Sequence, residues 1–505
     1  MSGDSLSQIE MSADRARGER PSSDRMFVGS AVMGFVGLAL IALGALQPKS
    51  PFTSAVPGSW PFHFSVSSVG QGGGTLLVYS GIVVLLAAWY LMGISSAERP
   101  LHHLYVVLAA WCVPLFAMPP LFSRDVYAYA ALGQLTSRGS NPYTYSPASL
   151  RAPSYLRFVD PLWRHAHAPY GPLFMDLGRG ISTLAGQSVV TTIESYRLVS
   201  LVGLLLIAVS VPVLARSTGR QPSAAFILAV LNPMVLLYLV GGAHNDALML
   251  GLLVAGVAVS IQGLPAFGIV VCALAAEVKI PGLIGVVFIG WTWGGQGSSY
   301  ARRCKYLVGA ILIAGVTMAV ISELSGLGWG WLSSLSDPGT VISWLDPATA
   351  LGLATSHVLG AVGVAHHVHP VIVATRAVGL VAAGLFTVIM MIRSDRYGLP
   401  KALGLSLLAI VILGPIVWPW YEAWGIVFLA FVVDRWARRL VLVVSAVACF
   451  ATAPTHLLLS TAAWFGLGSI LLGVVAVTLA FVQVNRKNGR SGSQSGALLP
   501  HRMAR

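Results

Sequence analysis

Residues 27–46 read FVGSAVMGFVGLALIALGAL, twenty consecutive residues without a charged side chain. An α-helix rises 1.5 Å per residue, so a run of this length crosses the roughly 30 Å hydrocarbon core of a bilayer. Similar apolar runs recur along almost the whole chain, whereas the short alternating segments of a membrane strand barrel are absent from the sequence. The pattern predicts an all-α polytopic membrane protein.

The overall composition agrees with this class. Of 505 residues, 56% are apolar and only 10% are charged, whereas soluble domains are about a quarter charged. The net charge of +13 is dispersed over short loops and tails, which is typical of membrane orientation and does not indicate nucleic-acid binding. The four cysteines have no CxxC spacing, so we expect neither a disulfide framework nor a zinc site.

We expect thirteen or fourteen transmembrane helices, with edges accurate to a few residues. Two pairs of runs meet at Pro and Gly residues, around 279–282 and 418–421, and each pair is also compatible with a broken helix. The candidate spans are 27–46, 75–94, 102–121, 190–214, 223–241, 246–262, 266–279, 281–293, 306–325, 369–393, 402–419, 421–433, 440–453 and 461–482.

The basic residues predict the orientation. Most of the 31 Lys and Arg residues fall in cytoplasmic segments if both termini are cytoplasmic. This leaves two large extracytoplasmic loops, 122–189 and 326–368, within a single transmembrane domain at 27–483 of a multi-pass plasma-membrane protein. The arginines of the first loop are either solvated or gather an anionic substrate. The tails at 1–26 and 484–505 are polar and are predicted to be disordered, and the first of them does not resemble a signal peptide.

Polar groups beside membrane-spanning segments give the first candidate site residues. The segment SRDVYAY at 123–129 opens the first large loop and places Asp125 at the outer interface. The alternative is an ordinary interfacial helix start, with Ser123 as the N-cap and Tyr127 and Tyr129 in the aromatic belt. Both interpretations stay open on local grounds.

Other polar clusters fall on the same predicted face. GSNPY at 139–143 is a turn by composition, APYGP at 168–172 is a rigid return to the membrane, and GGAHND at 241–246 joins two spans. The last is also compatible with a plain hairpin whose Asn or Asp caps the next helix.

Lys279 either forms a buried ion pair with Glu277 or contacts a phosphate. The histidines of 366–369 have no acidic or Cys partner nearby, so we expect no metal site there.

Taken in order, these motifs resemble one family. The likeness runs from about residue 105 to about residue 425, and its ordered motifs are SRDVYxY at 123, GxNPY at 139, APYGP at 168, LNPMV at 231, GGAHND at 241 and PWY at 419. The family is the actinobacterial polyprenol-phosphate-mannose-dependent α-1,6-mannosyltransferases, which build the mannan backbone of lipomannan and lipoarabinomannan. The resemblance implies the GT-C architecture and an essential acidic residue in the first large extracytoplasmic loop, where Asp125 matches.

The chemistry of that family fits these residues. A polyprenol-phosphate-mannose donor and a lipid-anchored mannan acceptor need one carboxylate base, because the phosphate leaves as a stable anion. If the donor is β-linked and the product α-linked, as the family implies, one displacement inverts the anomeric carbon and Asp125 is the base. Lys279 and Arg124 are the candidates for binding the donor phosphate, with Arg376 behind them. No cofactor is required, and a divalent metal is optional.

Further residues are expected to line the substrate site. Outer-face aromatic side chains suit a sugar ring, and the matched motifs add polar residues and two late aromatic residues. The residues are Tyr127, Tyr129, Asn141, Tyr143, Tyr170, His244, Asn245, Asp246, Trp420 and Tyr421, with Trp329, Trp331 and Trp344 as further sugar platforms.

Two other classes of function remain as alternatives. A transporter or lipid-linked sugar flippase would also have many spans and a few intramembrane charges, such as Glu194 and Arg197. We find no internal repeat, and the polar clusters lie at the outer boundary, which favours surface chemistry. A non-catalytic assembly subunit is the third class, and it requires Asp125 to be dispensable. The sugar itself is inherited from the resemblance.

Overall fold

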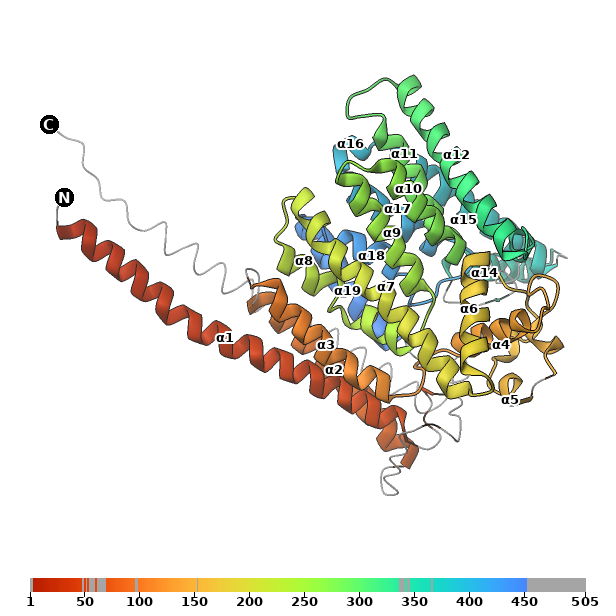
Figure 1. The fold of residues 1–505 in the computed structure, drawn as a ribbon, viewed down its shortest axis with the longest axis horizontal. Coiled ribbons are helices and arrows are strands. Elements are labelled where there is room, and N and C mark those ends of the chain that lie inside the picture. The colour runs from red at the N-terminus through yellow and green to blue at the C-terminus, as the bar shows by residue number, and fades with distance from the viewer. Residues whose placement is uncertain are drawn as a thin grey trace. The chain divides into compact units, whose positions relative to one another are not determined.

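The computed structural model describes residues 3–47, 50, 52–53, 60, 70–95, 99–151, 153–335, 341–342, 346–364 and 367–451, with only the backbone path for 3–23. These residues belong to one compact unit that extends to Pro454. Within the described ranges the regular elements are all helical, and none is a strand (Figure 1). The all-α prediction is confirmed. The predicted span 461–482 and the tail 484–505 lie outside the described residues.

The elements follow one another along the chain as a series of helices with short 3₁₀ turns and one π-helix. They are α1 (Gly3–Ala45), α2 (Gly70–Ser95), α3 (Leu101–Ala117), α4 (Asp125–Ser137), η1 (Pro147–Ser149), α5 (Pro153–Leu156), η2 (Pro161–Trp163), α6 (Pro172–Ala185), α7 (Val189–Ser217), α8 (Pro222–Ala229), η3 (Val235–Gly241), α9 (Asp246–Ile261), α10 (Pro265–Val278), η4 (Ile280–Gly282), α11 (Leu283–Trp293), α12 (Tyr300–Ser325), α13 (Trp331–Ser334), α14 (Pro347–Ala361), α15 (Val368–Ile392), α16 (Ser394–Tyr397), α17 (Leu399–Leu413), α18 (Ala423–Leu429) and α19 (Arg435–Phe450).

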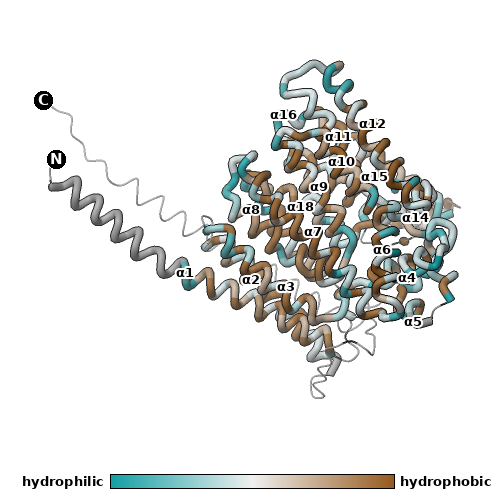
Figure 2. The backbone as a smooth tube through the Cα atoms, viewed as in Figure 1, coloured by the Kyte–Doolittle hydropathy of each residue, from teal (hydrophilic) through white to brown (hydrophobic). Residues whose placement is uncertain are grey.

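Several of these helices are long and apolar enough to cross a membrane. In the described part of the chain they are five: α1 from Asp24, α2 from Gly72, α7, α12 and α15. The π-helix η3 and α9 pass the same test together, although they are bent by 117° at their junction. The shorter helices α3, α10, α11 and α17 are also apolar. The prediction of a polytopic membrane protein is confirmed, and Figure 2 shows hydrophobic residues along these helices and hydrophilic ones in the loops.

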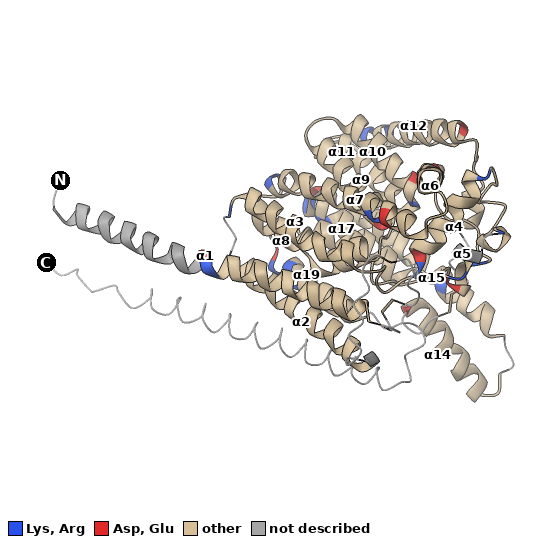
Figure 3. Ribbon diagram, turned by 60° about the horizontal axis from the view of Figure 1, so that its bottom comes forward, with Lys and Arg blue, Asp and Glu red and all other residues tan. Residues whose placement is uncertain are grey.

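The surface of the bundle carries apolar side chains as a lipid-facing protein should. On α12, Val308, Leu312, Val316 and Val320 are all more than half exposed. Soluble monomers rarely leave such contiguous apolar faces in water, whereas lipid tails solvate them without cost. Figure 3 shows correspondingly few charged residues along the helices.

Some expected spans are divided in the structure. The run 402–419 is helical only to Leu413, and the run 421–433 contains only α18, whose seven residues reach about 10 Å. The run 223–241 divides into α8 and η3. Pro and Gly interrupt the hydrogen-bond ladder at these points, which agrees with the broken-helix alternative. The runs 402–419 and 421–433 are therefore not two full crossings.

The first large loop is a packed helical layer rather than an irregular loop. It contains α4, η1, α5, η2 and α6, and α6 packs against α4, α10 and α12 (Figure 1). The contact of α4 with α6 is close, because a Cβ on Gly133 would lie 2.7 Å from the carbonyl oxygen of Gly178. At the N-terminus, α1 begins at Gly3, within the tail predicted to be disordered.

Candidate active site

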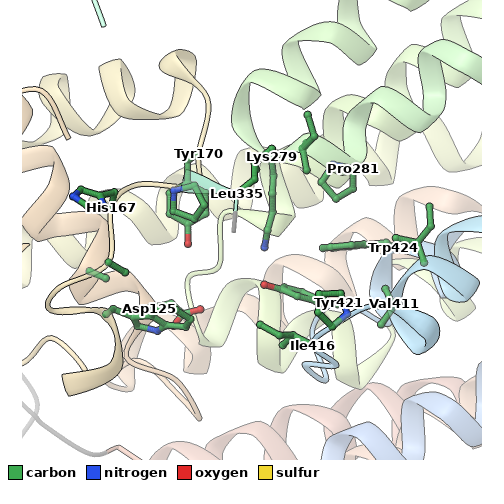
Figure 4. Close-up of a pocket in the computed structure, with 18 of the residues that line it drawn as sticks. Asp125, His167, Tyr170, Lys279, Pro281, Leu335, Val411, Ile416, Tyr421 and Trp424 are labelled. Atoms are coloured by element: carbon green, nitrogen blue, oxygen red, sulfur yellow. The ribbon is translucent and has the colours of Figure 1, made fainter. Parts of the chain in front are cut away.

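A cavity of about 240 Å³ lies where the helical layer of the first loop meets two helix breaks, α10–η4 and α17–α18. One side of it is polar and comes from α4 and residues 163–170, with Lys279 at the α10–η4 break. The other side is apolar and comes from α15, α17 and the segment after it (Figure 4). The lining residues are Asp125, Ala128, Leu132, Trp163, Ala166, His167, Pro169, Tyr170, Lys279, Ile280, Pro281, Leu335, Leu380, Ile410, Val411, Gly414, Pro415, Ile416, Tyr421 and Trp424.

Asp125 is the first residue of α4 and presents its carboxylate to the cavity. Its backbone N–H donates to Ser123 Oγ at 3.0 Å, but Arg124 occupies the N-cap position, so the suggestion that Ser123 is the N-cap is wrong. Asp125 Oδ1 accepts a hydrogen bond from Trp163 Nε1 at 2.9 Å, and Oδ2 lies 3.7 Å from Nδ1 of His244. Burial raises the pKa of Asp125 to about 6, against the opposing effects of Lys279 and Trp163. Asp125 is therefore ionised at neutral pH yet more basic than an exposed aspartate.

Lys279 forms an ion pair with Asp246 rather than with Glu277. Lys279 Nζ donates to both carboxylate oxygens of Asp246, at 2.8 and 2.9 Å. Trp424 Nε1 donates to the same Asp246 Oδ1 at 2.8 Å. The suggested pair of Lys279 with Glu277 is wrong, because the helix break at Lys279 turns the two side chains apart; the Glu277 carboxylate instead faces the backbone N–H of Leu173 at the start of α6.

Aromatic rings surround the ammonium group of Lys279. Its Nζ lies 4.2 Å from the ring centre of Tyr421 and 5.4 Å from that of Trp424. These two rings stack on each other at 4.5 Å, one helical turn apart at the start of α18. Cation–π contacts hold a positive charge in place without neutralising it. Figure 4 shows the ammonium group and the Tyr170 hydroxyl reaching into the space that Asp125 borders.

Two strained backbone positions bring Asp125 and His244 together. Phe122 and Ala243 have φ angles of 64° and 53°, the positive values among the described non-glycine residues. Phe122 directly precedes the motif at 123–129, and Ala243 directly precedes His244 within the motif at 241–246. The N–H of Leu121 donates to the carbonyl of Gly241 at 3.2 Å. A left-handed conformation is costly for residues with a Cβ and concentrates at functional sites, as do π-helices such as η3. The strain therefore accompanies the positioning of the two motifs.

The predicted substrate residues divide into three groups. Tyr170 and Tyr421 line the cavity with Asp125 and Lys279, whereas Arg124 is not among the lining residues. A second group is buried behind the cavity wall: Tyr129, His244, Asn245, Asp246 and Trp420. A third group, Tyr127, Asn141 and Tyr143, also does not line it.

The residues of the third group stabilise the first large loop, which forms one wall of the cavity. Asn141 Oδ1 accepts from the N–H of Tyr143 at 2.9 Å, and Asn141 Nδ2 donates to the Leu327 carbonyl at 3.2 Å. The Tyr143 hydroxyl donates to the carbonyl of Tyr170 at 3.0 Å. Tyr127 is buried and stacks on Phe158 at 5.3 Å, so it does not belong to an exposed aromatic belt.

The buried group supports the wall from behind. The Tyr129 hydroxyl donates to Asn245 Oδ1 at 3.3 Å. The His244 ring stacks on Trp420 at 4.1 Å, and Trp420 stacks on Trp418 at 5.1 Å. These residues therefore support the wall and are not among the residues that line the cavity.

Among the polar and aromatic residues that line the cavity, sequence reasoning missed three: Trp163, His167 and Trp424. Trp424 had a usable signal, because it follows Tyr421 by three residues and shares its helical face. Trp163 and His167 lie in an irregular stretch of the loop, where no periodicity indicates direction. Among the other platforms, Trp329 is exposed, Trp331 is fully buried, and Trp344 lies outside the described residues.

Arg376, the remaining candidate for binding the donor phosphate, lies away from the cavity. Arg376 donates to Thr349 Oγ1 at 2.9 Å and to the Val341 carbonyl, and it does not line the cavity. In the described ranges, no three His, Cys, Asp or Glu side chains gather as a possible metal site. His366 falls outside those ranges. Lys279 is thus the cation that the cavity presents.

Comparison with known proteins gives one consistent family. Residues 31–295 match the family model "Alpha-(1->6)-mannopyranosyltransferase, N-terminal domain", and residues 348–482 match "MptB C-terminal domain". The chain is 33% identical over 447 residues to a probable alpha-(1->6)-mannopyranosyltransferase of Mycolicibacterium smegmatis, covering 81% of this chain and 79% of that protein. No solved structure matches the chain.

Two further relatives agree. Alpha-(1->6)-mannopyranosyltransferase B of Corynebacterium glutamicum is 30% identical, over 84% of this chain and 76% of the relative. Alpha-(1->6)-mannopyranosyltransferase A of Mycobacterium tuberculosis is 32% identical, over 78% of both chains. The matches cover the cavity and the helices around it. This membrane protein is thus a mannosyltransferase and belongs to the α-(1→6)-mannopyranosyltransferase family.

Proposed function

We propose that the chain transfers mannose from polyprenol-phosphate-mannose to an α-1,6-mannan acceptor of the lipomannan core, at the outer face of the plasma membrane. The observation that carries this proposal is the shared cavity of Asp125 and Lys279, which presents both a carboxylate and an ammonium group. The first suits an acceptor hydroxyl and the second a phosphate. The family membership supports the sugar and the linkage.

The apolar half of the cavity suits a lipid-linked donor. Leu380 of α15 and Ile410 and Val411 of α17 line it, together with Pro281 and Ile416. A polyprenyl chain buries its methylene groups favourably against such side chains, at roughly 0.8 kcal/mol for each one removed from water. The donor is therefore expected to place its lipid between α15 and α17 and its phosphate near Lys279.

The reaction follows from this placement. Asp125 takes the proton of the acceptor hydroxyl as that oxygen attacks the anomeric carbon, and the carbon–phosphate oxygen bond breaks on the opposite side. The polyprenyl phosphate leaves with the bonding electron pair, and Lys279 stabilises its charge. A single displacement inverts the anomeric carbon. No general acid is needed, and a positive charge at the phosphate is available without a cofactor.

The membrane face on which the cavity lies and the GT-C architecture are part of the same proposal. The basic residues favour cytoplasmic termini, which puts α4 to α6 and the cavity on the extracytoplasmic face. A lipid donor can reach such a cavity from the bilayer while the growing glycan stays in water. This is the GT-C arrangement implied by the motifs, and it disfavours the transporter alternative, which requires access from both faces.

The test is Asp125→Asn in membranes supplied with polyprenol-phosphate-mannose and a short α-1,6-mannoside. The amide is nearly isosteric but cannot accept the proton, so we expect transfer to fall at least a hundredfold. Asp176→Asn is the matched control, because Asp176 is half-buried on α6, pairs with Arg179 and does not line the cavity. Full activity of Asp125→Asn would remove Asp125 from the mechanism. An inactive wild type with this donor would contradict the proposed reaction.

A further inference from the structure

Trp163 makes a direct contact with the carboxylate of Asp125. Its indole Nε1 donates to Asp125 Oδ1 at 2.9 Å, and its ring also lines the cavity. The two residues are 38 positions apart and come from different elements, η2 and α4. A tryptophan donates one hydrogen bond and accepts none, so this contact fixes one oxygen of the carboxylate and leaves the other.

The second oxygen has a different environment. Asp125 Oδ2 lies 3.7 Å from His244 Nδ1, which is too long for a hydrogen bond. Both ring nitrogens of His244 are buried without a hydrogen-bond partner in the described structure. Oδ2 therefore keeps its capacity to accept, while Oδ1 is already occupied by the indole.

We propose that Trp163 is a positioning residue, whose indole N–H holds Oδ1 of Asp125 so that Oδ2 takes the proton of the acceptor hydroxyl. This inference rests on the proposed function, with Asp125 as the base. A carboxylate free to rotate presents its oxygens in many directions, and fixing one of them preorganises the other. Trp163 thereby defines which oxygen reacts.

The loop around Trp163 keeps the indole in place. The Asp160 side chain accepts from the N–H of Leu162 at 3.0 Å and caps the η2 turn. Arg164 Nε donates to the Val159 carbonyl at 3.2 Å, and the Arg164 carbonyl accepts from the N–H of Ala148 at 2.7 Å. The bond to Asp125 therefore depends on a loop that is fixed on both sides of Trp163.

Apart from Trp163 and the Ser123 hydroxyl, the groups around Asp125 are charged or titratable. Lys279 lowers the pKa of Asp125 and Asp246 raises it, while His244 and the hydroxyls of Tyr129, Tyr170 and Tyr421 complete the surroundings. Removing the indole N–H changes one hydrogen bond and no charge. The bond stabilises the ionised carboxylate, so its loss raises the pKa of Asp125 further and leaves more of the base protonated at a given pH.

The test is Trp163→Phe, which keeps an aromatic ring in the cavity and removes the donor. We expect the acidic limb of the kcat–pH profile to move up by about one pH unit. At pH 7 kcat should then fall about twofold and at pH 5 nearly tenfold, with little change in the donor KM, and the loss should be recovered at alkaline pH. A purely structural role would instead lower activity at every pH alike.

Trp291→Phe is the matched control. Trp291 is buried in α11, its N–H has no hydrogen-bond partner in the described structure, and it does not line the cavity. We expect this variant to keep the wild-type pH profile. An unchanged profile in Trp163→Phe, or a loss of kcat that is uniform across pH, would overturn the inference. An inactive wild type would instead count against the proposed function.

Discussion

Asp125 and Asp246 are two carboxylates on neighbouring walls, and the fold gives them opposite partners. Asp246 is fully buried and accepts from Lys279 and Trp424, so its charge is compensated inside the protein. Asp125 remains slightly exposed, has a neutral hydrogen-bond donor and borders the cavity. A buried, paired carboxylate is a poor base, whereas a desolvated one with a raised pKa is a good one. This difference favours Asp125 as the proposed base and Asp246 as a supporting residue.

Lys279 and Asp246 can be tested as a pair. Removing one partner leaves a buried charge uncompensated, so Asp246→Asn or Lys279→Met alone should lower stability by about 3–5 kcal/mol. The double variant should regain much of that stability, because both charges are gone. Donor transfer should stay at least tenfold impaired in it, since the phosphate has lost its cation. Thermal unfolding in detergent and the donor KM are the measurements.

The double variant decides the role of Lys279. Regained stability together with wild-type transfer would mean that Lys279 serves only the fold. Regained stability with a raised donor KM would support the phosphate contact. The single variants serve as each other's controls, because both break the same ion pair.

Single residues show what the sequence could and could not predict. Asp125 was identified because an acidic residue at the outer end of an apolar run is unusual and the surrounding motif is specific. The partner of Lys279 was mistaken because Glu277 is adjacent in sequence, whereas Asp246 lies 33 positions away and pairs only through the fold. Trp163 carried no signal at all, since an irregular loop has no period from which its direction follows.

At the scale of elements, interrupted helices build the site. The breaks at η3–α9, α10–η4 and α17–α18 contribute His244 and Asp246, Lys279, and Tyr421 respectively. Irregular backbone is tolerated at membrane depth only where protein or a cavity surrounds it. Pro and Gly residues predicted the breaks at α10–η4 and α17–α18, whereas the residues at η3–α9 were expected to join two separate spans. The bend angles depend on packing, so the number of crossings did not follow from the sequence.

The packing of α7 against α9 sets the position of Asp246, the first residue of α9. A Cβ on Gly203 would lie 2.2 Å from the Ala247 carbonyl oxygen, and one on Gly251 would lie 2.4 Å from that of Gly203. Neither contact is possible without separating the helices. Gly203→Ala should therefore destabilise the protein by about 1–3 kcal/mol, lowering its melting temperature in detergent, and should reduce transfer by displacing Asp246.

Gly309→Ala in α12 is the matched control for that substitution. Gly309 also lies in a membrane-spanning helix, but a Cβ there would meet no atom within 4 Å. The same added methyl group should leave the melting temperature unchanged or raise it slightly. Equal losses in both variants would mean that the α7–α9 approach has no special importance.

At the scale of the whole molecule, the proposed reaction depends on which side of the membrane the cavity faces. The end predicted to be cytoplasmic carries ion pairs such as Arg303 with Asp395 and Lys401 with Asp434. The cavity instead belongs to the helical layer of the first loop. Composition and basic residues were sufficient to predict the class and to propose the orientation, because both depend on transfer energies rather than on packing.

The native chain already contains a probe of this orientation. Cys304 is exposed at the start of α12, whereas Cys112, Cys272 and Cys449 are buried. With a cytoplasmic α11–α12 loop, a membrane-impermeant maleimide should label Cys304 only after the cells are permeabilised. In a Cys304→Ser background, Arg151→Cys in the first large loop should be labelled in intact cells, because residue 151 is exposed. The opposite pattern would place Asp125 and Lys279 on the cytoplasmic side, where a donor presented at the outer face could not reach them.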